Sequence, residues 1–239
     1  MTTATAADYG WIRSATSPFR YALESGYTLV LVRGVSPAQL LALAEAEGRG
    51  VCAGLDELSE QHEAFLCESD GWDACVLAGV CTVPGDEGEW TLALALGGDL
   101  GSSGFMETLS AGTRVVSHAS NGGKPMEFFH WYENGELRTG FEWPRVRTGS
   151  TTDELNSLIC QVGLGLTDED ISRADRKAAV FALTERLTGV RVTPELLTSA
   201  AYRTAEVFEE PVEEWTGIVI DITDAHGVRT YVEVRNDEL

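Results

Sequence analysis

The chain has 239 residues, of which 44% are hydrophobic, and a formal net charge of −21 from 38 acidic and 17 basic residues. This length and composition predict one large folded domain, or one domain with an appendage, and exclude bulk disorder. The negative charge disfavours nucleic acid and anionic membranes as partners, because binding to phosphates needs clustered Lys and Arg. A basic protein is the partner that such a charge favours.

The sequence also gives expectations about the cellular location of the protein and about bound metals or cofactors. Its apolar runs are shorter than the roughly 18 residues of a membrane span, and Met1 to Tyr9 lack the basic start and apolar stretch of a secretory signal. We therefore expect a cytoplasmic protein. The five cysteines are irregularly spaced, without the Cys and His spacing of a zinc site, and this predicts reduced thiols with no metal and no cofactor.

Helical and strand patterns alternate in the first third of the chain. Residues 8–24 are predicted to be helical with a break near Pro18, and residues 27–33 form a buried strand rich in β-branched residues. Ser36 has the features of a helix cap, because proline follows it and a glutamine three positions later can reach back to it. That helix is expected to end near Glu47, and a polar surface helix is expected over residues 56–67.

Short strands joined by turns dominate the middle of the chain. They are predicted at residues 74–83, 90–96, 113–118, 126–132 and 136–142. The turn at Asn134-Gly135 is a strong hairpin signal, since both residue types tolerate a positive φ. The pattern predicts an α+β fold in which an antiparallel β-meander of about five strands packs against helices.

Helices and then a hairpin complete the chain. Helical segments are predicted after the capping pattern Thr151 to Glu154, over residues 167–189, and over residues 194–205. We accordingly divide the chain into an α+β domain, 1–205, and an appendage, 206–239, made of an acidic connector and a C-terminal β-hairpin. A hairpin alone is marginally stable in water. It must therefore dock on the main sheet, on a partner, or on a second copy through residues 212–235.

One set of polar residues in the predicted sheet is a candidate binding or catalytic pocket. His118 and His130 belong to adjacent predicted strands, with Arg114 and Tyr132 at alternate positions along the same strands. If the two faces coincide, these four side chains converge and can bind an anion or act as general acid and base. The alternative is that the two histidines lie near strand ends and pair with carboxylates, and the sequence favours this alternative.

Arg145 and Arg147, with Arg138 nearby, form the densest group of basic residues. This group can hold a carboxylate or phosphate, or it can bridge to the acidic starts of the following helices. The second reading is favoured in so acidic a chain. We include Arg145 and Arg147 among the candidate binding residues.

Several segments together resemble an uncharacterised actinobacterial family of unknown function that is common in streptomycetes. The matching stretches are Trp11-Ile12, residues 28–37, residues 90–93, residues 109–118, Phe129 with Asn134-Gly135, residues 147–150 and residues 183–197. The resemblance implies a shared α+β fold over about residues 11–200 and supplies no reaction. The family pattern has a Glu and an Asn-Gly after the Trp90 strand, where this chain has Ala95-Leu96-Gly97-Gly98.

Three functions follow as hypotheses, because no catalytic motif identifies a reaction. The leading one is a non-enzymatic binding or regulatory protein that engages a protein partner, such as an immunity-like or accessory factor. The second is an enzyme or small-molecule-binding protein of specialised metabolism that uses the polar pocket on the sheet. The third is a homo-oligomer assembled through the C-terminal hairpin.

Overall fold

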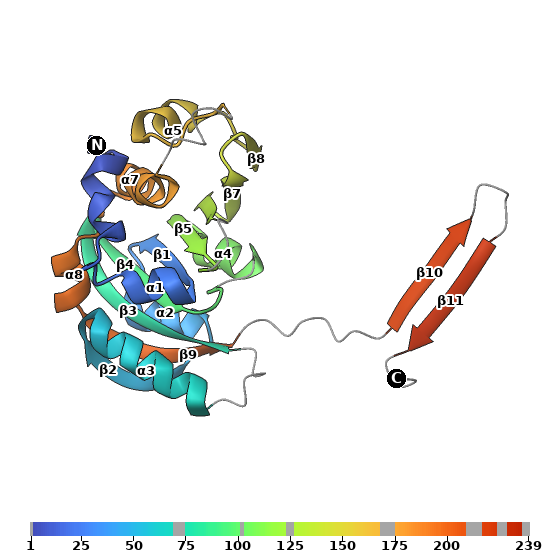
Figure 1. The fold of residues 1–239 in the computed structure, drawn as a ribbon, viewed down its shortest axis with the longest axis horizontal. Coiled ribbons are helices and arrows are strands. Elements are labelled where there is room, and N and C mark those ends of the chain that lie inside the picture. The colour runs from blue at the N-terminus through green and yellow to red at the C-terminus, as the bar shows by residue number, and fades with distance from the viewer. Residues whose placement is uncertain are drawn as a thin grey trace. The chain divides into compact units, whose positions relative to one another are not determined.

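A computed structural model describes residues 2–68, 75–100, 103–122, 127–167, 175–208, 217–223 and 229–235. The chain forms two compact units, Met1–Glu209 and Glu210–Leu239, whose ribbons are drawn in Figure 1. The first unit contains a large sheet with helices on both faces, and the second contains a two-stranded hairpin. Each unit is therefore described by itself.

The sheet of the first unit has nine strands, all paired antiparallel. Its order is β2-β9-β3-β4-β1-β5-β6-β7-β8. The bounds of these strands are β1 Tyr27–Arg33, β2 Glu47–Ala53, β3 Cys75–Gly85, β4 Gly88–Leu96, β5 Arg114–Ser120, β6 Glu127–Glu133, β7 Glu136–Trp143, β8 Val146–Thr148 and β9 Ala201–Phe208.

Helices cover both faces of this sheet, as the ribbon in Figure 1 shows. Their bounds are η1 Ala6–Arg13, α1 Arg20–Ser25, α2 Pro37–Leu43, α3 Gly54–Glu68, α4 Ser103–Leu109, α5 Asn156–Val162, α7 Arg176–Thr188 and α8 Pro194–Ser199. The larger core packs η1, α1, α3, α5, α7 and α8 against one face, here called the major face. The smaller core packs α2 and α4 against the other, the minor face.

The central strand β1 shows why both faces are covered. Leu29 and Leu31 belong to the major core, whereas Val30 and Val32 belong to the minor core. Successive side chains of a strand point to opposite faces, so a continuous apolar run is buried only when both faces are packed. Each fully buried aliphatic side chain of this kind stabilises the fold by about 1.5–3 kcal/mol.

The α+β class is confirmed, but the expected five-strand meander is wrong. The sheet has nine strands, and β1 lies between β4 and β5, so it separates strands that a meander would place side by side. The last strand, β9, inserts between β2 and β3. These placements need long-range pairing, which the local patterns that locate strands and turns do not encode.

Several local predictions are confirmed. The Ser36 side chain accepts a hydrogen bond from the Gln39 backbone at the start of α2, and the Gln39 side chain accepts one in return. Asn134 and Gly135 adopt φ of 55° and 81° in the turn between β6 and β7. Gly189 ends α7 in the left-handed conformation with φ of 70°.

Two predicted helices extend too far, and a third begins late. α2 ends at Leu43 and β2 begins at Glu47, while α8 ends at Ser199 and β9 begins at Ala201. α5 begins at Asn156 without a side-chain cap, so the pattern from Thr151 does not cap it. The predicted helical residues 168–174 lie outside the described part of the chain.

The second unit contains the hairpin that the sequence predicts. Its strands are β10, Gly217–Thr223, and β11, Arg229–Arg235, which pair antiparallel from Gly217 with Arg235 to Thr223 with Arg229. The connector residues 209–216 and the turn residues 224–228 lie outside the described part of the chain.

Candidate functional site

The four polar residues considered for a pocket lie on opposite faces of the sheet, so the condition of that hypothesis, that the two faces coincide, is not met. In the β5–β6 register, His118 is opposite Phe129 and Arg114 is opposite Glu133, whereas His130 is opposite Ser117 and Tyr132 is opposite Val115. Because side chains alternate, Arg114 and His118 face the major core, and His130 and Tyr132 face the minor core. The register of β5 against β6 therefore separates the two pairs.

His118 is part of the major core. Its side chain is 1% exposed, its Nδ1 lies 3.2 Å from the Tyr27 hydroxyl, and its ring lies edge-on to Phe181 at 4.5 Å. Its Nε2 has no hydrogen-bond partner among the described residues. Burial, and then the charge of Lys177, lower the pKa of His118 to about 3. His118 is therefore a neutral side chain that stabilises an aromatic cluster.

His130 and Tyr132 lie side by side along β6, with ring centroids 6.2 Å apart. Burial lowers the pKa of His130. Burial, followed by the nearby Glu107 carboxylate, raises the pKa of Tyr132. Both pKa shifts favour the uncharged form of the side chain. Of the four residues considered for the pocket, His130 and Tyr132 are the two whose rings lie near each other.

The arginines of the predicted site connect elements of the fold. Arg114 donates to the Leu187 carbonyl at 3.0 Å and to Glu133 at 2.9 Å, and its guanidinium lies over the Trp131 ring. These contacts join β5 and β6 to the end of α7. Arg114 therefore has a structural role in this part of the fold.

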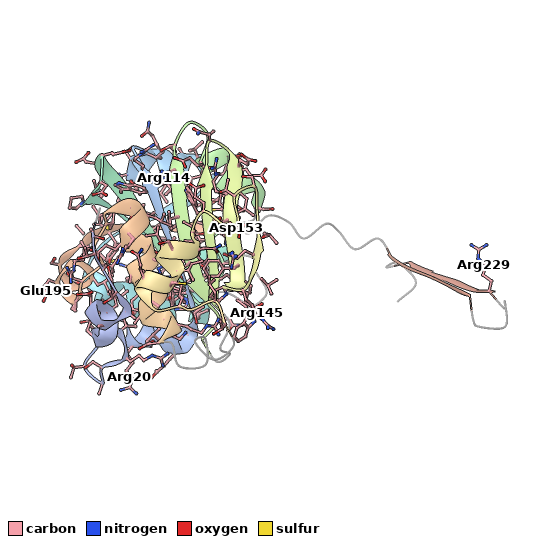
Figure 2. All side chains as sticks on the ribbon, turned by 90° about the horizontal axis from the view of Figure 1, so that it is seen from above. Arg20, Arg114, Arg145, Asp153, Glu195 and Arg229 are labelled. Carbon is pink, nitrogen blue, oxygen red and sulfur yellow. The ribbon has the colours of Figure 1, made fainter. Side chains whose placement is uncertain are left out.

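The arginines near β8 bridge to the acidic segment before α5, as the favoured alternative predicted. Arg147 donates to the Thr152 carbonyl at 2.8 Å and pairs with Asp153 at 3.3 Å, and Arg138 pairs with Glu154 at 3.0 Å. Arg145 is exposed, and Figure 2 shows it well apart from Arg114. The candidate basic residues thus do not form a single site.

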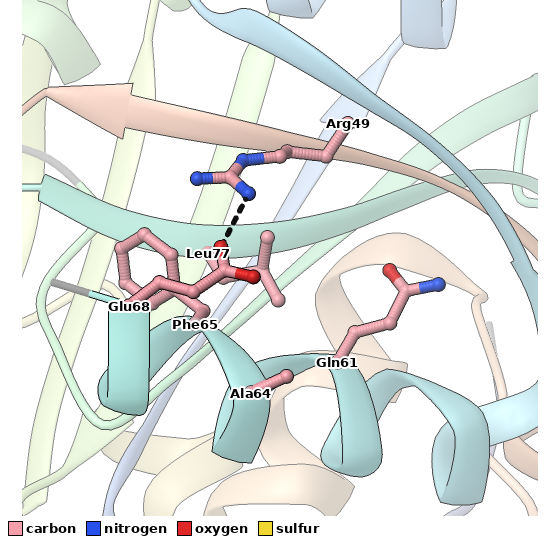
Figure 3. A pocket seen from close by; sticks show the side chains of 6 residues that line it. All are labelled: Arg49, Gln61, Ala64, Phe65, Glu68 and Leu77. Atoms are coloured by element: carbon pink, nitrogen blue, oxygen red, sulfur yellow. Dashed lines mark hydrogen bonds and ion pairs between the residues drawn. The ribbon is translucent and has the colours of Figure 1, made fainter.

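A different group of residues, which the sequence patterns missed, surrounds a half-open pocket on the major face. It is lined by Arg49, Gln61, Ala64, Phe65, Glu68 and Leu77 (Figure 3). The pocket has a volume of about 180 Å³, smaller than the roughly 300–1,000 Å³ of typical small-molecule sites. It therefore suits one side chain better than a cofactor.

Arg49 organises this pocket. It donates to Glu68 at the end of α3 at 2.9 Å, contacts the Glu206 carboxylate of β9, and lies 5.8 Å from the Phe65 ring centroid. The Glu206 side chain is only 12% exposed, so the guanidinium supplies the charge that its burial requires. Arg49 thereby fixes β2 to both β9 and α3.

The strand that carries Arg49 is an edge of the sheet. Among the described strands, β2 pairs with β9 alone, and six of its seven residues are exposed. Val51 is 73% exposed, which is unusual for a β-branched residue in a strand. The pairing register shifts between Gly48 and Gly50, so Arg49 lies in a bulge. Edge strands present unpaired backbone N–H and C=O groups that can pair with another chain.

Other site types find no support in the described part of the chain. No group of three or more His, Cys, Asp or Glu there is arranged to hold a metal ion. No described helix is long and apolar enough to cross a membrane. All five cysteines are free thiols, and burial raises the pKa of Cys52 to about 11 and that of Cys81 to about 12.

These features define an acidic α+β protein with a nine-stranded antiparallel sheet and one long exposed edge. The model of DUF6461, a family of unknown function, matches residues 2–212, and the chain belongs to this family. The match includes β2, the pocket and β9. The chain shows no significant similarity to a curated protein or to a solved structure.

Proposed function

We propose that this chain is a non-enzymatic binding protein that engages a protein partner by adding the partner's strand to β2. The observation that carries the proposal is the open edge of β2, a seven-residue strand paired on one side among the described strands. In this mode, backbone hydrogen bonds supply affinity, and pockets for alternate side chains supply specificity.

The opposite edge of the sheet makes a useful comparison. β8 has three residues, Val146–Thr148, and short edge strands protect a sheet from unwanted pairing. β2 is longer and lies beside a pocket, as a strand-binding edge requires. The net charge of −21 steers basic partners toward the molecule, which suits an immunity-like or accessory factor that sequesters a basic protein. We place this role in the cytoplasm of an actinobacterium, on the sequence patterns alone.

Paired lysine substitutions on the two edges test the proposal. Val51→Lys places a charge on the β2 edge, and Val146→Lys, at a residue 63% exposed on β8, is the matched control. Lysine on an edge strand opposes strand addition, while substitution of exposed side chains changes stability by less than about 0.5 kcal/mol.

The measurement is quantitative capture of partners by the tagged full-length protein in a streptomycete host. We expect a stoichiometric protein that is recovered with wild type and Val146→Lys but lost with Val51→Lys. Failure to recover a stoichiometric protein, or equal recovery with both variants, would contradict the proposal.

A further inference from the structure

We infer that the partner of β2 is an extended basic segment that places one apolar side chain in the pocket lined by Arg49, Phe65 and Leu77. The inference rests on the proposed function and narrows the chemistry of the partner. It joins three properties of this region: a short stretch of regular edge strand, a side-chain-sized pocket beside it, and an acidic helix next to both.

The regular part of the β2 edge is short. After the bulge at Arg49, the pairing with β9 continues in register from Gly50 with Thr204 to Ala53 with Ala201. A partner strand can therefore pair along residues 50–53, except at the Ala53 N–H, which already donates to the Glu57 carboxylate at 2.7 Å. So few backbone hydrogen bonds, each worth about 0.5–1.5 kcal/mol net, do not hold a partner by themselves. Additional side-chain contacts must supply the rest.

The pocket supplies an apolar contact. Ala64, Phe65 and Leu77 form its apolar walls, and Arg49 of β2 forms its side toward the sheet edge (Figure 3). Its volume of about 180 Å³ is close to the roughly 150 Å³ of a cavity that holds one benzene-sized group. Arg49 is already paired with Glu68 and Glu206, so its guanidinium is not available to a bound anion. An aliphatic or aromatic side chain fits it best.

Helix α3 supplies the electrostatic contact. It has no Lys or Arg, and all five of its acidic residues are exposed. These residues are Asp56, Glu57, Glu60, Glu63 and Glu68. The guanidinium of Arg49 is shared between two carboxylates, so it does not cancel this charge. Lysine or arginine residues that flank the apolar anchor of a bound strand therefore complement this face.

A synthetic peptide tests the inference directly. The probe is a fluorescent peptide of about nine residues that alternates lysine and threonine around a central leucine, with a matched peptide in which serine replaces the leucine. We expect the full-length protein to bind the leucine peptide at least about tenfold more tightly in fluorescence anisotropy, because burying one leucine is worth about 1.5–3 kcal/mol. Binding should weaken between about 50 mM and about 500 mM salt.

A pocket-filling variant separates the contribution of the pocket to peptide affinity from the contribution of the surface charge. Ala64→Phe fills the pocket from α3, and Ala42→Phe, at an exposed alanine of α2, is the control. We expect Ala64→Phe to reduce the affinity for the leucine peptide to that for the serine peptide, and Ala42→Phe to leave it unchanged. Equal affinity for the two peptides, or unchanged leucine-peptide affinity in Ala64→Phe, would overturn the inference.

Two further outcomes distinguish this inference from the proposed function. If the captured partner is lost with Val51→Lys but retained with Ala64→Phe, the edge binds a partner and the inference about the pocket is wrong. If light scattering shows a wild-type dimer that Val51→Lys dissociates, the edge binds a second copy, and the basic-segment inference is overturned.

Discussion

Replacement of His118 by Phe removes a titratable group that is buried between Tyr27 and Phe181. In the folded wild type, burial and the charge of Lys177 lower the pKa of His118 from 6.5 to about 3. The unfolded chain therefore binds a proton here between pH 6.5 and about 3, whereas the folded chain does not. The unfolding free energy must fall as the pH falls through 6.5, and His118→Phe removes this contribution.

The expected magnitude follows from the two pKa values of His118. Each pH unit below the unfolded-state pKa costs the folded state about 1.4 kcal/mol, until the folded-state pKa is reached. Between pH 8 and pH 5, this single residue lowers the unfolding free energy of the wild type by about 2 kcal/mol. Carboxylates also titrate over part of this range, but they do so in both proteins and cancel in the comparison.

Urea unfolding followed by tryptophan fluorescence at pH 8 and pH 5 measures the difference. We expect the wild type to lose about 2 kcal/mol more than His118→Phe on acidification. Tyr27→Phe is the control, because it removes the hydroxyl partner but leaves His118 buried, so it should keep the wild-type pH dependence. Equal losses in wild type and His118→Phe would refute the assignment of His118 as a buried neutral residue.

Three other predictions concern the fold. Gly54→Ala should lower the unfolding free energy by at least about 2 kcal/mol, because Gly54 has φ of +77° and a Cβ there meets the Thr198 carbonyl. Gly10→Ala, with open space around it, should be nearly neutral in the same urea assay. Arg49→Met should destabilise the protein by about 1–3 kcal/mol by leaving the Glu206 carboxylate buried, and Glu206→Gln in that background should recover part of the loss. Alkylation of the native protein at pH 8 should modify the exposed Cys67 and Cys160 and spare the buried Cys52 and Cys81, as mass spectrometry can measure.

The sequence patterns located the elements that local chemistry determines. The Ser36 cap, the Asn134-Gly135 turn and the β3–β4 hairpin all depend on residues close in the chain, and each is confirmed. β2 depends instead on distant partners. Its sequence has two glycines and two charged residues, and it becomes a strand only by pairing with β9. Such long-range pairing leaves no local periodicity to detect.

The errors about the candidate site have the same physical origin. Whether His118 and His130 share a face depends on the register of β5 against β6, and a shift of one residue reverses the answer. One sequence pattern does indicate part of the pocket, namely the apolar face of α3. Leu55, Leu58 and Phe65 follow the spacing of a helical apolar face, so α3 packs on the sheet and is not a purely surface helix. The position of Arg49 beside that helix requires the sheet order.

Hydrogen exchange of the β2 backbone, measured with and without the captured partner, tests the central claim most directly. Amides alternate in direction along a strand, and the outward-facing amide of Ala53 already donates to Glu57. Strand addition therefore places its new hydrogen bond on the Val51 amide, and we expect slower exchange there on binding and unchanged exchange in β8. Protection confined to other segments, with the Val51 amide exchanging as in the free protein, would contradict the account.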